Sequence, residues 1–212
     1  MLTMQSTRFA VAVLAVAFSL LAASERNASA QADWINALRQ GGYVIVFRHG
    51  ATHANQADTD PLNPRNVAAQ RQLNDAGRAK AKEIGEAFRK LKIPVGQVHT
   101  SVFNRAVENG KLMNLGEVTP SLDITEGGLV VTPDENYRRS QALRRLAGTA
   151  PPAGTNTIVI SHKPNILDAF GKDFFDVREG EAAVFQPSGG GYKLIVRVQP
   201  DEWSKLAQAA PN

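Results

Sequence analysis

The feature that most limits how this chain can fold is an apolar run that stops at a charged corner. Residues 43–47 read Tyr-Val-Ile-Val-Phe, and Arg48-His49-Gly50 follows at once. An unbroken apolar run of this length, rich in β-branched residues, predicts a strand buried on both faces, as in the parallel sheets of α/β proteins. The carboxyl end of such a strand is where α/β sheets bind ligands. We therefore expect the corner to lie at a binding edge.

The chemistry of this corner suits a phosphoryl group. The guanidinium of Arg48 can neutralise phosphate oxygens, and the imidazole of His49 can attack phosphorus. Gly50 lets the backbone approach closely. The corner is therefore a candidate site of phosphoryl chemistry.

Strand-like and helical segments alternate along the rest of the chain, which predicts an α/β fold. We expect a three-layer α/β/α sandwich around a mostly parallel central sheet. The last two strands, joined through residues 188–191, are expected to form an antiparallel hairpin at the sheet edge. Residues 51–66 and 121–133 are rich in turn-forming residues and are expected to be loops. The expected strands are 43–48, 97–100, 157–160, 182–186 and 192–198, and the expected helices are 34–38, 75–91, 105–114, 134–147 and 165–170.

The first 30 residues differ from the rest of the chain. An apolar run covers residues 9–23, Arg8 precedes it, and Ala28-Ser29-Ala30 follows. This pattern is typical of a secretory signal peptide cut after Ala30. A membrane anchor is the alternative, but the run is shorter than the ~20 residues that span a bilayer comfortably. We expect a signal peptide over residues 1–30, one domain over residues 31–212, and a periplasmic or secreted protein without stable membrane insertion.

Charge and composition narrow the possible partners. The chain has 24 Lys and Arg against 20 Asp and Glu, a net charge of +4, without the run of like charges typical of a nucleic-acid patch. It contains no cysteine, which excludes a thiolate nucleophile, a disulfide and a cysteine metal site. Its His, Asp and Glu residues are not spaced as metal ligands. We therefore expect no metal, no cofactor and no nucleic-acid partner, and a small anionic substrate.

Two further motifs follow the Arg-His-Gly corner in order. Thr100-Ser101 precedes Arg105-Ala106, and the apolar run 157–160 ends in Ser161-His162-Lys163-Pro164. With Arg48-His49-Gly50, this order resembles the histidine phosphatase superfamily, also called phosphoglycerate-mutase-like, over about residues 41–198. The resemblance implies a phosphoglycerate-mutase-like fold. It also implies hydrolysis of phosphomonoesters through a phosphohistidine intermediate.

The resemblance also implies a role for each matched residue. His49 is the expected nucleophile, and neighbouring cations should disfavour its protonation. Arg48 and Arg105 are the expected phosphate-binding arginines, because a guanidinium binds pairs of phosphate oxygens. His162 is the expected second catalytic histidine, in contact with the same phosphate.

Five more residues complete the expected site or compete for a place in it. Thr52 and Asn55 match the family pattern Arg-His-Gly-x-Thr-x-x-Asn, and both can donate hydrogen bonds to phosphate oxygens. Cleavage of a phosphomonoester also needs a proton for the leaving oxygen. Glu126, between the second arginine and the second histidine, is the expected general acid, with Asp123 and Glu181 as alternatives.

The motif around His162 also resembles the small SixA-type phosphohistidine phosphatases, which lack an equivalent acid. The main expectation is an exported, metal-independent phosphatase that acts on small phosphomonoesters. A phosphohistidine (SixA-type) protein phosphatase is one alternative, and a catalytically weak binding protein for a phosphorylated ligand is another. The sequence predicts no particular oligomeric state.

Overall fold

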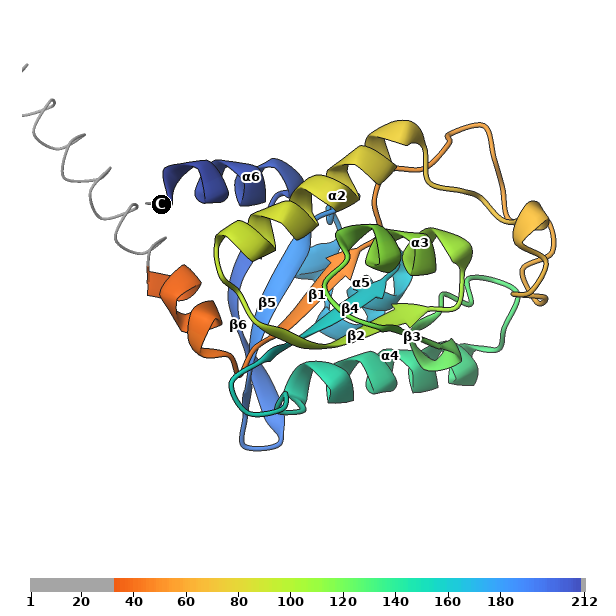
Figure 1. Ribbon diagram of the computed structural model, residues 1–212. Coiled ribbons are helices and arrows are strands. Elements are labelled where there is room, and N and C mark those ends of the chain that lie inside the picture. The colour runs from red at the N-terminus through yellow and green to blue at the C-terminus, as the bar shows by residue number, and fades with distance from the viewer. Residues whose placement is uncertain (1–32, 211–212) are drawn as a thin grey trace, which may run out of the picture. The chain divides into compact units, whose positions relative to one another are not determined.

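Strand β1 (Val44–Arg48) runs through the interior of a six-stranded sheet (Figure 1). Its first four residues are buried, as the apolar run predicts. The computed structural model describes residues 33–210, so the predicted signal peptide and its cleavage site lie outside the described residues. Residues 33–40 are helical. One compact unit begins at Leu38 and contains all six strands of the sheet.

The sheet is parallel except at one edge. Its strand order is β3-β2-β4-β1-β5-β6. Parallel pairing joins β3 to β2, β2 to β4 and β4 to β1, and antiparallel pairing joins β1 to β5 and β5 to β6. The predicted mostly parallel sheet with a C-terminal hairpin at its edge is therefore confirmed. The bounds of the other strands are β2 (Val95–Ser101), β3 (Val118–Ser121), β4 (Asn156–Ser161), β5 (Ala182–Ser188) and β6 (Gly191–Val198).

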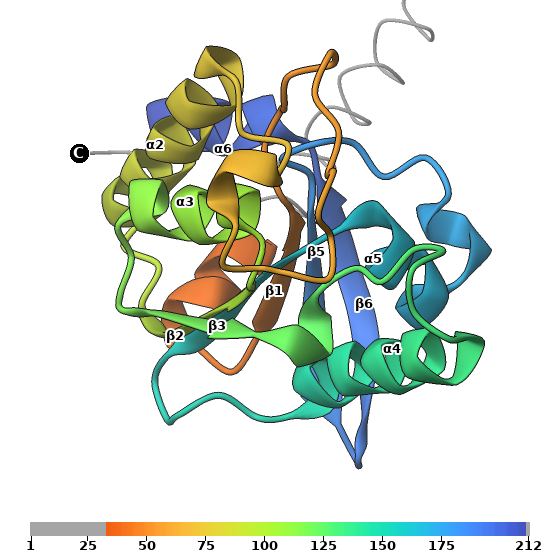
Figure 2. The same cartoon turned by 90° about the vertical axis from the view of Figure 1, so that its right-hand side faces the viewer.

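Helices cover both faces of the sheet, which confirms the three-layer α/β/α arrangement. One layer contains α2 (Asp75–Lys90), α3 (Asn104–Met113) and α6 (Pro200–Ala209). The other contains α4 (Pro133–Gly148) and α5 (Lys163–Phe170), as Figures 1 and 2 both show. No helix within residues 33–210 is both long enough and apolar enough to cross a membrane. Short 3-10 turns are η1 (Val67–Ala69), η2 (Leu122–Ile124) and η3 (Lys172–Phe174).

The core continues on both sides of β1. Toward α2 and α6, the ring of Phe47 packs against the rings of Phe88 and Trp203. The ring centroids of Phe88 and Trp203 lie 4.6 Å from each other. Toward α4, Val46 belongs to a buried cluster that includes Leu143. Burying such a side chain contributes about 1.5–3 kcal/mol. Because a shift by one residue would exchange the two faces, this packing fixes the register of β1 and places its charged end at the sheet edge.

Two elements were not predicted from the sequence. Strand β3 contains Pro120, which lacks an N–H, but it is an edge strand and an edge strand tolerates this loss. Helix α6 begins with Pro200 at its first turn and has a capping box between Gln199 and Glu202. These start signals were present in the sequence and could have predicted α6.

Two long connections meet at the carboxyl end of the parallel strands. One joins β1 to α2, and the other joins β3 to α4; both views place them at the same edge of the sheet (Figures 1 and 2). The predicted loop 51–66 has no helix or strand, apart from the isolated bridge of Thr52 to Leu73. The predicted loop 121–133 includes the 3-10 turn η2. The sheet edge and these connections together form the candidate site.

Candidate active site

The two motif histidines follow adjacent parallel strands. β1 and β4 pair with Arg48 opposite Ser161, so His49 and His162 come next on neighbouring strands. The backbone N–H of His49 donates to the carbonyl of Ser161 over 3.1 Å. The two rings have centroids 5.2 Å apart. The sheet register therefore brings together two histidines that are 113 positions apart in the sequence.

His49 has the geometry of a neutral nucleophile. Its Nδ1 lies 2.8 Å from the carbonyl oxygen of Gly50. Because a carbonyl only accepts, Nδ1 carries the proton and Nε2 keeps its lone pair. Burial lowers the pKa of His49 well below its usual range, and the nearby His162 and Arg105 lower it further. The imidazole is therefore neutral near neutral pH and can attack through Nε2.

Asn109 and Gly77 hold the corner that carries His49. The side-chain oxygen of Asn109, on α3, accepts from the N–H of Gly50 over 2.7 Å. Gly77, in the first turn of α2, lies so close to Ala51 that a Cβ there would overlap the Ala51 carbonyl. The side chain of Asn74 caps α2 and also donates to the carbonyl of Thr52 over 3.0 Å. Two helices therefore fix the backbone around the candidate nucleophile.

His162 presents one ring nitrogen to the site. Its Nε2 lies 2.7 Å from the hydroxyl of Ser101 at the end of β2. That hydroxyl accepts from the N–H of Phe103, and within residues 33–210 its own proton has no acceptor other than Nε2, so we assign this proton to the hydrogen bond with Nε2. Nδ1 then carries the ring proton, and it is buried without a hydrogen-bond partner. Burial lowers the pKa of His162 well below its usual range, with smaller contributions from Arg105, Arg71 and Arg48. His162 is therefore a neutral donor.

Arg105 lies fully buried at the start of α3. Its guanidinium lies 4.6 Å from the centroid of the Phe103 ring. One terminal nitrogen donates to Asp58 over 2.8 Å, and the other pairs with Glu126. A buried arginine needs such partners, because an unpaired buried charge costs several kcal/mol. The phosphate-binding arginine expected from the sequence is thus held between two carboxylates.

Arg48 is turned toward the connection that precedes β5. It donates to the carbonyl of Val177 over 2.8 Å and lies 3.4 Å from Glu179. Glu179 also accepts from the hydroxyl of Thr52 over 3.0 Å. The structure therefore joins Thr52 to Arg48 through one carboxylate. The Nε atoms of Arg48 and Arg105 are both buried without a hydrogen-bond partner within residues 33–210.

The structure distinguishes the three candidate acids by position. Glu126 pairs with Arg105, and its carboxylate lies 3.6 Å from Nδ1 of His162. Asp123 is exposed and pairs with Arg138 on α4 over 2.7 Å. Glu181 is buried, but its side chain pairs with Arg197 on β6 over 2.5 Å. Of the three, Glu126 is the one placed against the motif residues.

Asn55, which the sequence predicts as a phosphate ligand, forms no hydrogen bond or ion pair with the other predicted site residues within residues 33–210. It is exposed in the turn after Thr52. None of the contacts within residues 33–210 joins it to the two histidines or the two arginines. Its role as a phosphate ligand stays a prediction.

Several residues of the cluster were missed in the sequence. Asp58 accepts from the backbone N–H of Arg71 and from Arg105. Glu179 joins Arg48 to Thr52. Both lie in connections, where no periodic pattern marks a residue. Asn109 is different, because it stands four positions after Arg105 on one helix and therefore on the same face. That spacing could have identified it.

The helix ends add to the positive potential of the site. Arg105 is in the first turn of α3, and His162 immediately precedes α5. Helix amino ends carry partial positive charge and favour anions. Within residues 33–210 no group of three or more His, Asp or Glu residues is arranged to hold a metal ion. A neutral buried imidazole beside two arginines and a carboxylate can carry out nucleophilic attack on an anionic, electrophilic centre such as phosphorus.

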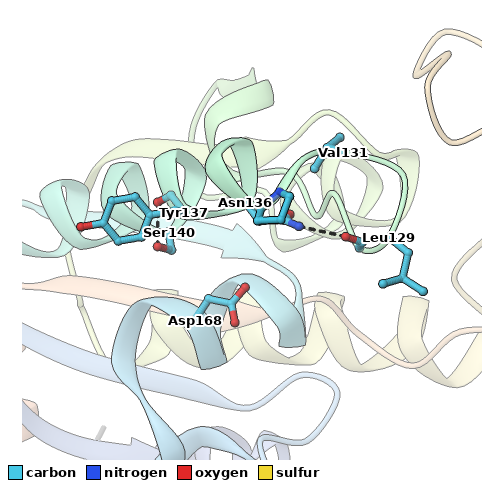
Figure 3. Close-up of a pocket in the computed structure, with 8 residues that line it drawn as sticks. Leu129, Val131, Asn136, Tyr137, Ser140 and Asp168 are labelled. Carbon is cyan, nitrogen blue, oxygen red and sulfur yellow. Dashed lines mark hydrogen bonds between the residues drawn. The ribbon is translucent and has the colours of Figure 1, made fainter.

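A pocket of about 620 Å³ elsewhere contains none of these residues. It lies between α4, α5 and the turn that precedes α4, and its lining includes Tyr137, Ser140 and Asp168 (Figure 3). Volume alone would favour it as the functional site. We favour the histidine cluster, because the pocket lacks a nucleophile with an adjacent base and lacks the buried cations of the cluster.

Comparison with solved structures identifies similar folds. The protein histidine phosphatase SixA, solved as a complex with tungstate, matches over 76% of this chain and 98% of its own, at 21% identity and a TM-score of 0.51. A protein from Escherichia coli K-12 assigned as an alpha-ribazole-5'-phosphate phosphatase matches over 76% of this chain and 98% of its own, at 14% identity and a TM-score of 0.52. Both belong to the histidine phosphatase superfamily, which confirms the predicted phosphoglycerate-mutase-like fold. No protein-family model matches the sequence, and no curated protein is significantly similar to it.

Proposed function

We propose that this chain, which has the fold of the histidine phosphatase superfamily, hydrolyses phosphomonoesters through a phosphohistidine on His49. The observation that carries the proposal is the buried imidazole of His49. Its proton is fixed on Nδ1 by the Gly50 carbonyl, and it lies beside a second histidine with a ring nitrogen left to donate. A purely structural histidine pair does not need both a free nucleophilic nitrogen and an unpaired buried donor.

The first step forms a bond between Nε2 of His49 and phosphorus while the bond from phosphorus to the ester oxygen breaks. Arg48, Arg105 and the Nδ1 proton of His162 bind the oxygens of the transferring group and offset its charge. Glu126 in its protonated form gives its proton to the leaving oxygen, which departs as an alcohol. The Gly50 carbonyl stabilises the Nδ1 proton of the phosphorylated ring.

The second step reverses the role of Glu126. Its carboxylate takes a proton from a water molecule, whose oxygen attacks phosphorus opposite to His49. The phosphorus–nitrogen bond breaks, and inorganic phosphate leaves with neutral His49 restored. The carboxylate partners of Arg105 must give way to the phosphate in this scheme, because they use its two terminal nitrogens.

A phosphohistidine protein phosphatase is the second candidate. It is supported by the similarity of the fold to SixA and by the Ser161-His162-Lys163-Pro164 motif. Glu126 favours the ester hydrolase, because an alcohol leaving from phosphorus needs a proton donor more than a ring nitrogen does. A binding protein without turnover would not need a carboxylate beside the donor nitrogen of His162.

We also propose that the protein is exported. The support comes from the signal-peptide pattern of residues 1–30. An antibody or epitope tag at the C-terminus would locate the mature chain in a cell fraction. N-terminal sequencing that begins at Gln31 would support cleavage after Ala30, and a mature chain that begins at Met1 would contradict it.

The activity is tested by hydrolysis of p-nitrophenyl phosphate with and without EDTA. We expect turnover that EDTA does not reduce and that His49→Ala abolishes. His53→Ala is the matched control, because His53 is a half-buried histidine in the adjoining loop and is outside the cluster. Turnover in His49→Ala equal to the wild type would refute the proposal. Activity that EDTA abolishes would refute metal independence.

A further inference from the structure

A small cavity of about 60 Å³ opens directly beside Glu126. Four segments line it: the loop at residues 61–64, the turn between β2 and α3, residues 122–131, and Arg139 on α4. The lining is mainly apolar. Its apolar side chains include those of Leu62, Phe103, Leu122, Val130 and Val131.

The cavity adjoins the proposed general acid. Glu126 lines it and also pairs with Arg105. Phe103 lines it and lies under the guanidinium of Arg105. If Glu126 protonates the leaving oxygen, the organic group attached to that oxygen lies on the Glu126 side of the phosphate. The apolar cavity is therefore next to the reacting bond.

The polar groups that line the cavity are already engaged. The hydroxyl of Thr125 donates to the carbonyl of Ser121 over 2.8 Å and accepts from the N–H of Val102 over 3.0 Å. Arg139 donates to Glu135 and to the carbonyl of Thr125. A sugar or glycerol group placed here would lose water without gaining equivalent partners. An apolar group placed here would lose no hydrogen bonds to water, because it makes none.

A structured turn holds the outer wall of the cavity. The N–H of Val130 donates to the carbonyl of Gly127, and Asn136 donates to the carbonyl of Gly128 over 2.9 Å (Figure 3). Gly127 lies against Val131, and a Cβ at this glycine would overlap that side chain. The double glycine after Glu126 is thus needed to fold two valines back toward the acid.

The rim exposes apolar surface beside a charged site. Leu62 is 70% exposed, Leu122 is 52% exposed and Val130 is 47% exposed. Exposed apolar groups that cluster around a cavity mark a binding surface more often than exposed groups that are scattered singly. Here all three line the cavity that also contains Glu126.

We propose that the substrate is a phosphomonoester of an apolar alcohol, with a short alkyl chain seated in this cavity. This inference rests on the proposed function and specifies its substrate class. It excludes sugar phosphates and glycerol phosphates as preferred substrates. Recognition is divided between the arginines and His162, which bind phosphate, and the apolar cavity, which selects the alcohol.

The test compares methyl, butyl and hexyl phosphate with glycerol 3-phosphate. Alkyl phosphates of increasing length have nearly constant leaving-group chemistry, so differences among them report binding of the chain. We expect kcat/KM to rise about fourfold per methylene from methyl to butyl phosphate, the factor that corresponds to the free energy of burying a methylene. We expect glycerol 3-phosphate to be at least about tenfold poorer than butyl phosphate, because its hydroxyls find no partners in the cavity.

Two matched variants assign the effect to the cavity. Val130→Ser should remove most of the dependence on chain length, and Leu129→Ser should retain it. Leu129 is fully exposed one position away and does not line this cavity. Leu122→Ser is a second cavity variant and should act like Val130→Ser. Inorganic phosphate should inhibit all three variants as it inhibits the wild type.

The outcomes separate this inference from the proposed function. Turnover of p-nitrophenyl phosphate without dependence on chain length would overturn the inference alone. Equal effects of Val130→Ser and Leu129→Ser would also overturn it. If no ester is hydrolysed at all, the proposed function fails and the inference fails with it. A preference for a phosphohistidine peptide over butyl phosphate would likewise overturn the inference.

Discussion

Replacing Glu126 by Gln should separate binding from chemistry. The change keeps the shape of the side chain but removes its charge and its ability to transfer a proton. General acid catalysis contributes about 10²–10⁴-fold to a rate. We therefore expect kcat for butyl phosphate to fall by about 10²–10³-fold. The kcat for p-nitrophenyl phosphate should fall by less than about tenfold, because p-nitrophenolate leaves with little need for a proton.

The same variant should bind inorganic phosphate more tightly. The Glu126 carboxylate lies 3.6 Å from Nδ1 of His162, so a phosphate oxygen that accepts from Nδ1 comes close to this negative charge. Two like charges about 4 Å apart repel by about 4 kcal/mol at an effective dielectric constant of about 20. Partial exposure and the pairing with Arg105 reduce this to about 1 kcal/mol. The inhibition constant for phosphate should therefore fall about fivefold.

The assay measures kcat for both esters and the inhibition constant for phosphate. Asp123→Asn is the matched control, because Asp123 is an exposed carboxylate three positions away that pairs with Arg138. It should leave all three quantities unchanged. Equal slowing of both esters by Glu126→Gln would refute the assignment of Glu126 as the acid. Weaker binding of phosphate would refute its placement beside the phosphate.

The remaining predictions concern the arginine, the second histidine and pH. Arg105→Lys should raise the inhibition constant for phosphate at least about tenfold, because Lys lacks the planar pair of donors; an unchanged constant would place Arg105 outside the phosphate site. Ser101→Ala should weaken phosphate binding about threefold to tenfold, since the His162 proton can then move to Nε2; a change in stability with unchanged phosphate binding would contradict this positioning role. The folded-state pKa values of His49 and His162 are lowered by burial, so the unfolded chain takes up protons first as the pH falls. Stability should therefore be fully present above about pH 6.5 and should decrease below it. Urea midpoints that do not change between about pH 7.5 and pH 5 would contradict these shifts.

The motif residues could be located from the sequence because local patterns fix them. His49 follows an apolar run typical of an interior strand, and His162 follows another. In a parallel sheet both carboxyl ends lie at the same edge, so the pattern predicts that edge for both histidines. Their contact was implied by the family resemblance and is given by the pairing of β1 with β4. The position of Arg105 at this edge could be predicted too, because it lies in the first turn of the helix that follows β2.

The carboxylates that surround these residues could not be located in the same way. Asp58 and Glu179 lie in connections whose backbone path depends on tertiary contacts rather than on periodicity. Their contacts with Arg105 and Arg48 span 47 and 131 residues of sequence. The apolar cavity at Glu126 likewise combines residues from four segments between positions 61 and 139, so only the structure shows that apolar side chains lie beside Glu126.

The most direct test of the account is to identify the phosphorylated residue during turnover. The protein would be quenched within the first turnover of p-nitrophenyl phosphate, and its peptides would be analysed by mass spectrometry under alkaline conditions, which preserve phosphohistidine. The account predicts a phosphoryl group on His49 in the wild type and none in His49→Ala. A phosphoryl group on His162 or on any other residue, or turnover without a phosphorylated protein, would contradict it.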